Sequence, residues 1–155
     1  MIKTCKCGNV MSDSTVPNKV VYWTYFEDEW EKQIQDILGK IHYPFIRTVW
    51  HCDKCDRLYN WEPKDNKLYT YFIETQDSSK NKCTCENDLN TGTLLNVYSY
   101  NDYESPSIQS QIKKGEEPIF PRKVELCPKC KKVFVWKGDK LKVFYVEDVI
   151  DLKGE

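Results

Sequence analysis

The chain has 155 residues, and its 23 basic residues nearly balance its 24 acidic ones. Five Trp, ten Tyr and six Phe are enough to build a hydrophobic core, so the composition excludes an intrinsically disordered chain. The length fits one ordinary domain or two very small ones, and two small ones would need a staple such as a metal or a disulfide.

The N-terminal sequence "MIKTCKCGNV" lacks the apolar segment of a signal peptide, and no stretch reaches the roughly 18 apolar residues of a membrane span. We therefore expect a cytoplasmic protein with no membrane partner. Eight cysteines in a reducing compartment favour metal binding over disulfides.

In the first half of the chain, the sequence predicts a short turn that carries two cysteines, then a strand, a helix and three further strands. The aromatic run at 19–26 is typical of a strand. The segment 27–40 carries apolar residues at helical spacing, with Asp28 as a plausible N-cap and Gly39 as a stop signal. The remaining strands are expected at 44–50, 58–62 and 67–74.

The second half predicts the same order with a shorter helix. Ser105 is the expected cap of that helix, Pro106 occupies its first position and Gly115 ends it. We expect the final residues, 148–155, to pack loosely. The strands are expected at 97–100, 119–126, 133–137 and 140–147.

The eight cysteines form four pairs in the order C-x-C, C-x-x-C, C-x-C, C-x-x-C. The second C-x-C follows the first by 78 residues, and the second C-x-x-C follows the first by 75. Both copies read F-x-R-x-V-x-x-C-x-x-C-x-x-[LV]-[YF]-x-W, beginning at Phe45 and Phe120, so the chain is an internal duplication. The cysteines are Cys5, Cys7, Cys52 and Cys55 in copy one, and Cys83, Cys85, Cys127 and Cys130 in copy two.

Each copy offers the four soft ligands that Zn²⁺ prefers in a tetrahedral site, at about 2.3 Å. A C-x-x-C on a tight turn directs two sulfurs at one centre, and a distant second pair closes the site, as in a zinc ribbon. We predict two structural zinc ions, because four thiolates leave no open coordination position. The alternatives are disulfides, iron in a rubredoxin-like site, or one cysteine of each C-x-C as a free core thiol.

These elements predict an α+β, β-rich fold of two tandem zinc ribbons, each with a helical insert between its cysteine pairs. Copy one should occupy 1–76 and copy two 80–149, with a polar boundary near 75–82 and a tail at 150–155. The aromatic strands offer a surface through which the two copies can dock on each other.

The stretch from Arg122 to Lys142 contains eight basic and two acidic residues. One interpretation is that these lysines offset the metal cluster, because Zn²⁺ with four thiolates carries a charge of about −2. The other is a phosphate-binding face, since zinc ribbons often bind nucleic acid. That face would consist of Arg122, Lys123, Lys131, Lys132 and Lys137.

The helix start of copy one has the opposite character. A solvated helix with acids placed favourably against its dipole would explain it. The alternative is a contact surface for a basic protein partner. Under the second interpretation the contact residues are Tyr25, Glu27, Asp28, Glu29, Trp30 and Glu31.

Four further residues occupy equal positions in the two copies. We expect Arg47 and Arg122 each to pair with an acid on a neighbouring strand. We expect Trp61 and Trp136 to pack beside the zinc loops rather than to stack on bases.

No catalytic motif is present in the sequence. The two histidines belong to no H-x-x-x-H or H-x-E arrangement, and the chain has no nucleophile elbow or Walker loop. The metal sites would use all eight cysteines, so none remains as a nucleophile. We therefore predict no enzymatic activity and no small-molecule substrate.

The N-terminal half combines C-x-C-G, S-[DN], P-N, a D-E-W helix start and a C-x-x-C-[GD]-R-[LI]-Y ending. The matching positions are Cys5, Cys7, Gly8, Ser12, Asp13, Pro17, Asn18, Tyr25, Asp28, Glu29 and Trp30. Over about residues 1–74 the chain thereby resembles a group of small uncharacterised bacterial proteins associated with polymorphic-toxin immunity loci. Copy two departs from this pattern, since it lacks the glycine after Cys85 and the D-E-W. Each copy also resembles the zinc-ribbon superfamily, which bears on fold and not on function.

We expect the protein to act by binding another macromolecule. The resemblance implies an immunity-type inhibitor that blocks a toxin by occlusion, through acidic and aromatic surface of copy one. The alternative is a nucleic-acid-binding regulator that uses the basic face at 122–142. A purely structural subunit is the third possibility.

Overall fold

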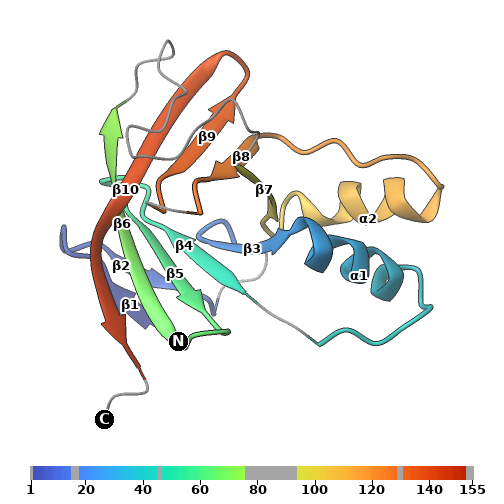
Figure 1. Cartoon of the computed structure of the whole chain (residues 1–155), viewed down its shortest axis with the longest axis horizontal. Helices are drawn as coiled ribbons and strands as arrows, with labels where there is room; N and C mark the ends of the chain where they lie inside the picture. The colour runs from blue at the N-terminus through green and yellow to red at the C-terminus, as the bar shows by residue number, and fades with distance from the viewer. Residues whose placement is uncertain (1, 15–17, 45–46, 76–93, 129–130, 153–155) are drawn as a thin grey trace.

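The computed structural model describes residues 2–14, 18–44, 47–75, 94–128 and 131–152 (Figure 1). They form a closed antiparallel barrel of eight strands, a separate two-stranded hairpin and two short helices. The strand order around the barrel is β10-β6-β5-β4-β3-β7-β8-β9.

Both halves of the chain contribute elements in the same order. The first half supplies β1 (Ile2–Thr4), β2 (Val10–Ser12), β3 (Val21–Phe26), α1 (Glu27–Ile37), β4 (Thr48–His51), β5 (Leu58–Glu62) and β6 (Lys67–Thr75). The second half supplies β7 (Leu95–Tyr100), α2 (Ser105–Lys113), β8 (Lys123–Leu126), β9 (Val133–Lys137) and β10 (Lys140–Asp151).

The predicted fold of two tandem zinc ribbons is wrong. Three-stranded ribbons exist locally, as β4–β5–β6 and β8–β9–β10. However, β3 pairs with β7 and β6 pairs with β10, so the two copies close into one barrel. An open edge strand leaves a row of backbone groups unpaired, and closure of the barrel pairs them. The fold is therefore mostly β, with four barrel strands from each half.

The internal duplication is visible in the barrel as a pseudo-two-fold arrangement. Thr24 in β3 pairs with Ser99 in β7, and these residues are 75 apart, the spacing of the C-x-x-C repeat. On the opposite wall Phe72 in β6 pairs with Tyr145 in β10, with ring centroids 3.8 Å apart. These two are also equivalent, once the two-residue deletion in the second hairpin is counted. The predicted docking of the aromatic strands is confirmed by the β3–β7 pair.

The two helices lie side by side on one side of the barrel, because the strands that precede them are paired (Figure 1). Trp30 of α1 packs on Tyr25 and Tyr100, which are themselves stacked at 6.2 Å. Ile108 and Ile112 of α2 complete this cluster. Neither of the two described helices is long and apolar enough to cross a membrane.

Three local predictions need correction. The N-cap of α1 is Phe26 rather than Asp28, because the Glu29 carboxylate accepts a hydrogen bond from the Phe26 amide and fixes the helix start there. The N-cap of α2 is Glu104 rather than Ser105. Residues 148–151 were expected in a loose tail, but they continue β10 and pair with β6. Residues 76–82 of the predicted boundary lie outside the described residues.

A buried ion-pair network joins α1 to the barrel. Arg47 and Glu29 are each only 3% exposed, and the guanidinium bonds both carboxylate oxygens of Glu29. Arg47 Nε also donates to Glu62 at 2.7 Å, so β5 shares the network. The equivalent Arg122 donates to Glu104, next to α2, at 2.6 and 2.8 Å. The prediction that each arginine pairs with an acid on a neighbouring strand is thus confirmed for Arg47, whose partner Glu62 lies on β5. The acid that binds Arg122 lies instead at a helix start.

Replacing Glu29 with Gln should lower the free energy of unfolding by about 3 kcal/mol, because the buried Arg47 loses negative charge. Burial acts to raise the pKa of Glu29, but hydrogen bonds from Arg47, the Phe26 amide and Lys64 hold that pKa below its ordinary value. A carboxyl with a lowered pKa stabilises the fold above its unfolded pKa, and this stabilisation is lost as the pH falls through the folded pKa. In urea unfolding, the difference in the free energy of unfolding between the wild type and Glu29→Gln should become smaller toward acid pH.

The control is Glu31→Gln on the same helix, because Glu31 is exposed. It should change the stability by less than about 0.5 kcal/mol. Equal losses for the two variants would contradict a special role for the buried pair.

Candidate metal centre

Four cysteine sulfurs converge between the β1–β2 hairpin and the turn that joins β4 to β5. Cys5 Sγ lies 3.4 Å from Cys55 Sγ, and Cys7 Sγ lies 3.6 Å from Cys52 Sγ. All four sulfurs are within 4.8 Å of one another. A tetrahedral zinc with thiolates at about 2.3 Å holds its sulfurs about 3.8 Å apart. The donor set and its spacing therefore fit one metal ion such as zinc.

Two tight backbone turns direct these sulfurs inward. In the first, the Gly8 amide donates to the Cys5 carbonyl at 2.8 Å, and Gly8 has φ +96°, a conformation that favours glycine. In the second, the Cys52 amide donates to the Arg57 carbonyl and the Asp56 amide donates back to Cys52. Asp56 itself has φ 66°. These turns explain why C-x-C and C-x-x-C can serve one centre.

Three side chains donate hydrogen bonds to the sulfurs, which stabilises the thiolate form and orients the ligands. The tyrosine also accepts a hydrogen bond from the Lys6 amide at 3.0 Å, which fixes the direction of its own donor. The donors are Tyr59 to Cys5 at 3.3 Å, Asn9 to Cys52 at 3.4 Å and Arg57 to Cys55 at 3.4 Å.

The pKa values of two of the cysteine thiols are shifted in opposite directions. Burial acts to raise the pKa of Cys5, but hydrogen bonds from the Cys7 amide and the Tyr59 hydroxyl lower it to about 6. Burial raises the pKa of Cys55 to about 12, and its contact with Cys5 adds to the effect. Metal ions bind the thiolate form of cysteine, so metal binding releases the protons that the metal-free ligands carry.

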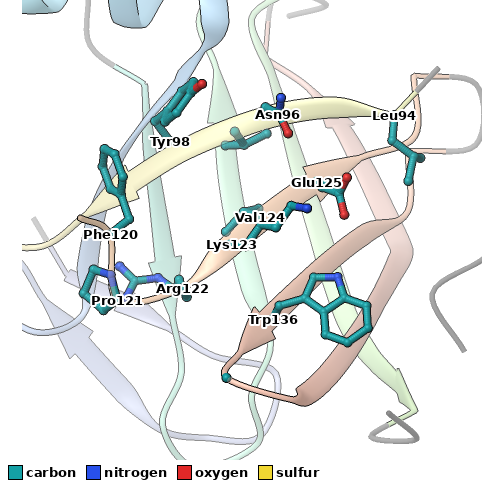
Figure 2. A pocket seen from close by; sticks show the side chains of 12 residues that line it. Leu94, Asn96, Tyr98, Phe120, Pro121, Arg122, Lys123, Val124, Glu125 and Trp136 are labelled. Carbon is teal, nitrogen blue, oxygen red and sulfur yellow. The ribbon is translucent and has the colours of Figure 1, made fainter. Parts of the chain in front are cut away.

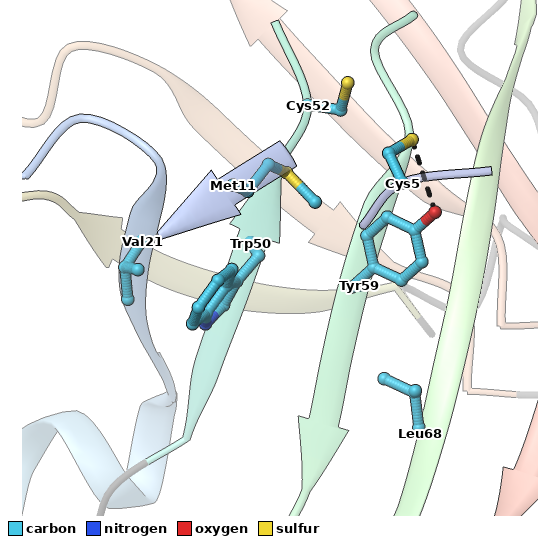
Figure 3. Close-up of a cluster of buried hydrophobic side chains, with 7 residues drawn as sticks. All are labelled: Cys5, Met11, Val21, Trp50, Cys52, Tyr59 and Leu68. Atoms are coloured by element: carbon cyan, nitrogen blue, oxygen red, sulfur yellow. Dashed lines mark hydrogen bonds between the residues drawn. The ribbon is translucent and has the colours of Figure 1, made fainter. Parts of the chain in front are cut away.

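The centre rests on the hydrophobic core of the first half. Figure 3 shows Tyr59 donating to Cys5, with Met11 near Cys52 and Trp50 in the same buried cluster. Trp61 packs against Trp50 at 5.4 Å between ring centroids, which confirms the prediction of packing for Trp61. Loss of the metal would therefore disturb the core and not only a surface loop.

Copy two is described only in part. Cys83, Cys85 and Cys130 lie outside the described residues, and Cys127 is fully buried within them. The turn at Cys127 repeats that at Cys52, with Cys127 N donating to Lys132 O and Lys131 N to Cys127 O, both at 2.9 Å. Within the described ranges there is a single four-cysteine cluster.

The residues predicted to contact a protein partner divide into two groups. Tyr25, Glu29 and Trp30 are at most 5% exposed, so they belong to the core and cannot contact a partner without unfolding. This corrects their assignment as surface anchors. Glu27, Asp28 and Glu31 are exposed on α1 and remain available to a partner.

The residues predicted to contact nucleic acid do not share one face. Arg122 lies in the bend just before β8, and Lys123 is the first residue of that strand. The Arg122 guanidinium binds Glu104 and lies over the ring of Tyr22, which lines the barrel interior, and Arg122 also borders the outer groove. Lys123 lines the outer groove and not the interior cavity. Lys137 lies at the end of β9, and Lys131 and Lys132 belong to the cysteine turn. The predicted continuous basic face is thus divided by the barrel wall.

A groove that we did not predict from sequence lies on the outer face of β7, β8 and β9 (Figure 2). Its volume is about 870 Å³, with Tyr98 and Phe120 at one end and Trp136 at the other. Trp136, expected to pack beside a zinc loop, also contacts the core cluster of Cys127 and Phe134.

Comparing the two copies would have revealed the groove. Val21 and Trp50 are buried in copy one, and their counterparts 75 residues later are Asn96 and Glu125. Exchange of two buried apolar residues for polar ones is the signal that, among the described residues, this face of copy two differs from the covered face of copy one.

Residues 2–75 match the family model described as "Domain of unknown function (DUF8617)". This segment is a DUF8617 domain. Searches of curated proteins and of solved structures each found no match. The DUF8617 domain spans β1 to β6 and includes all four cysteines of the described cluster.

Replacing Cys52 with Ser in the DUF8617 domain should remove one bound metal ion and strongly destabilise the protein. The reason is that the energy of binding a structural metal is folding energy. Metal content by inductively coupled plasma mass spectrometry and thermal unfolding would measure both effects. Retention of the full metal content would contradict the ligand assignment.

Replacing Tyr59 with Phe keeps the buried ring and removes the donor to Cys5. We expect the metal affinity to fall about tenfold or more, the usual effect of losing such a partner. Competition with a chromophoric chelator measures this affinity. The control is Ser14→Ala, which removes an exposed hydroxyl that does not contact the sulfurs. It should leave the metal affinity unchanged.

Proposed function

We propose that the protein is a metal-stabilised, non-catalytic binding protein whose partner is another protein. The groove over β7, β8 and β9 is the observation that carries this proposal. It lies outside the barrel, so it could receive a segment of a second chain without any change in the core.

The groove has the chemistry of a protein-binding surface. Its ends are aromatic, and Tyr98, Phe120 and Trp136 are all partly exposed. Aromatic side chains of this kind supply most of the binding energy at many interfaces. Tyr98 and Phe120 are held from behind by Trp30, at 5.6 and 5.4 Å between ring centroids, so they need little ordering on binding.

Acidic residues at one end of the groove favour a basic partner. Burial raises the pKa of Tyr98, and the charges of Glu27, Glu117 and Glu31 raise it further, which places these acids near the groove. All three acids are exposed. Negative charge here attracts a basic protein and repels nucleic-acid phosphates.

The finer proposal is that the partner is a toxin and that the protein acts as its inhibitor. It is supported by the resemblance of the N-terminal half to proteins of toxin-immunity loci and by the acidic surface next to the groove. An enzyme that handles phosphates carries basic residues at its own site, so this surface could occlude it directly.

The test begins with native mass spectrometry of the protein isolated from its own cells, to identify a stoichiometric partner. Asn96→Trp then fills the groove from an exposed position and should weaken binding of that partner at least tenfold, because the aromatic anchors become inaccessible. Ile2→Trp, an equally bulky change at an exposed site on β1, is the control and should bind normally.

Two outcomes would overturn the proposal. Equal binding by the Asn96→Trp and Ile2→Trp variants would exclude the groove. Recovery of bound oligonucleotide, with affinity that falls steeply with salt, would favour a nucleic-acid-binding function instead.

We also propose that copy two holds a second structural zinc through its own four cysteines. The proposal is supported by the matched backbone turns at Cys52 and Cys127 and by φ of 66° and 67° at Asp56 and Lys131. Wild-type protein should contain two zinc ions, and Cys127→Ser should retain one. A wild-type content of one ion would sink this proposal and leave the first site intact.

A further inference from the structure

The interior of the barrel holds a cavity of about 330 Å³ to which all eight strands contribute lining residues. Small-molecule sites have volumes of about 300 to 1,000 Å³, and an eight-stranded barrel is wide enough for one small ligand. The cavity has no cysteine in its wall, and it shares Val97, Arg122 and Val124 with the outer groove. Most of its wall is apolar and includes Val49, Leu58, Val124, Val133, Val135 and Phe144.

One end of the cavity carries an excess of positive charge. Lys137 of β9 is the register partner of Lys140 of β10, and Arg122 precedes Lys123, which pairs with Trp136. Arg122, Lys137 and Lys140 therefore form one row across three neighbouring strands, and all three line the cavity. Arg122 has Glu104 as its partner, whereas Lys137 and Lys140 have no ion-pair partner among the described residues.

In copy one, the positive charge of the equivalent arginine, Arg47, is neutralised by carboxylates. Glu62 occupies the position equivalent to Lys137, 75 residues earlier, and it binds Arg47 at 2.7 Å. Glu29 binds the same guanidinium, so the copy-one arginine is buried between two carboxylates. Glu62 in copy one thus neutralises a buried arginine, whereas Lys137 at the equivalent position in copy two adds a positive charge that attracts anions.

Inside the cavity one polar atom has no partner. Asn60 lines the cavity, and its Oδ1 is buried without a hydrogen bond. Its equivalent in copy two is Val135, so the barrel itself does not require an amide at this level. A buried acceptor without a donor destabilises the fold, and a ligand hydroxyl or amine that donates to it would recover this energy.

We propose that the barrel interior binds a small amphipathic anion. Its anionic head group, a carboxylate or a phosphate, would contact Lys137, Lys140 and Arg122. Its apolar body would lie along the valine, leucine and phenylalanine wall, and a donor on that body would reach Asn60. This site differs from the proposed partner groove, because most of its lining residues do not border the groove.

The test is isothermal titration calorimetry of the metal-loaded protein with decanoate, decyl phosphate and decyltrimethylammonium. The two anions should bind and the cation should bind at least tenfold more weakly, because one head group would be attracted and the other repelled by the lysines. The stronger of the two anions identifies the head group. Equal binding of anion and cation, or binding of none, would overturn the proposal.

Two variants then locate the site. Lys137→Gln with Lys140→Gln should weaken anion binding at least tenfold, because the double variant removes two charge-assisted hydrogen bonds to the head group. The matched control, Lys67→Gln with Lys113→Gln, removes the same charge from positions that line neither the cavity nor the groove and should bind like the wild type. Equal weakening by both pairs would indicate attraction by net charge only and would contradict the proposed site.

Val135→Phe fills the interior and should abolish binding of decanoate. Its unfolding curve must be compared with that of the wild type, because an added ring can strain the barrel. Should this variant not fold, Asn60→Val, which copies the equivalent residue of copy two, is used with 10-hydroxydecanoate. The variant should lose the advantage of the hydroxylated ligand over decanoate, and an unchanged advantage would contradict the role of Asn60.

Discussion

The pairing of β3 with β7 is the contact on which the rest of the structure depends. It joins the two halves of the duplication, with Thr24 opposite its own equivalent Ser99. It also brings α1 and α2 together over a shared aromatic cluster, because each helix follows one of these strands. The second junction, β6 with β10, then closes the barrel. Neither half could bury its edge strands alone, so closure between the copies is the physical solution to the edges that a ribbon exposes.

Duplication followed by divergence explains where the candidate sites lie. An arginine–glutamate pair is retained in both halves, buried as Arg47 with Glu29 and partly buried as Arg122 with Glu104, and each ties a helix start to the barrel. Where the halves differ, surface or interior chemistry changes. Trp50 is replaced by Glu125 at the outer groove, and Glu62 by Lys137 at the inner cavity. Copy one therefore maintains a closed core beside its cysteines, whereas copy two presents the outer groove and the cationic end of the cavity that both copies line.

The metal centre and the barrel stabilise each other. The sulfurs come from a hairpin outside the barrel and from the β4–β5 turn within it, so a bound metal fastens β1 and β2 onto the barrel wall. Tyr59 belongs to β5, lies in the core and donates to Cys5, which links the centre directly to barrel packing. A site of this kind, without an open ligand position, contributes stability rather than chemistry.

Sequence alone determined the local elements and one cluster of cysteines that could hold a metal ion. Alternating and helical patterns located the barrel strands and both helices within a few residues, and the spacing of Cys5, Cys7, Cys52 and Cys55 identified a set that does converge. These features depend on residues near each other in the chain or on ligand chemistry, which a linear pattern records.

Only the tertiary structure decided the barrel, the burial of Trp30 and Glu29, and the place of Arg122, but not of Lys123, in the wall of the interior cavity. The reason is that strand pairing between copies is a long-range choice. The strands of a zinc ribbon and the strands of a barrel show the same alternation of apolar and polar residues. The face that each strand buries depends on which strand pairs with it.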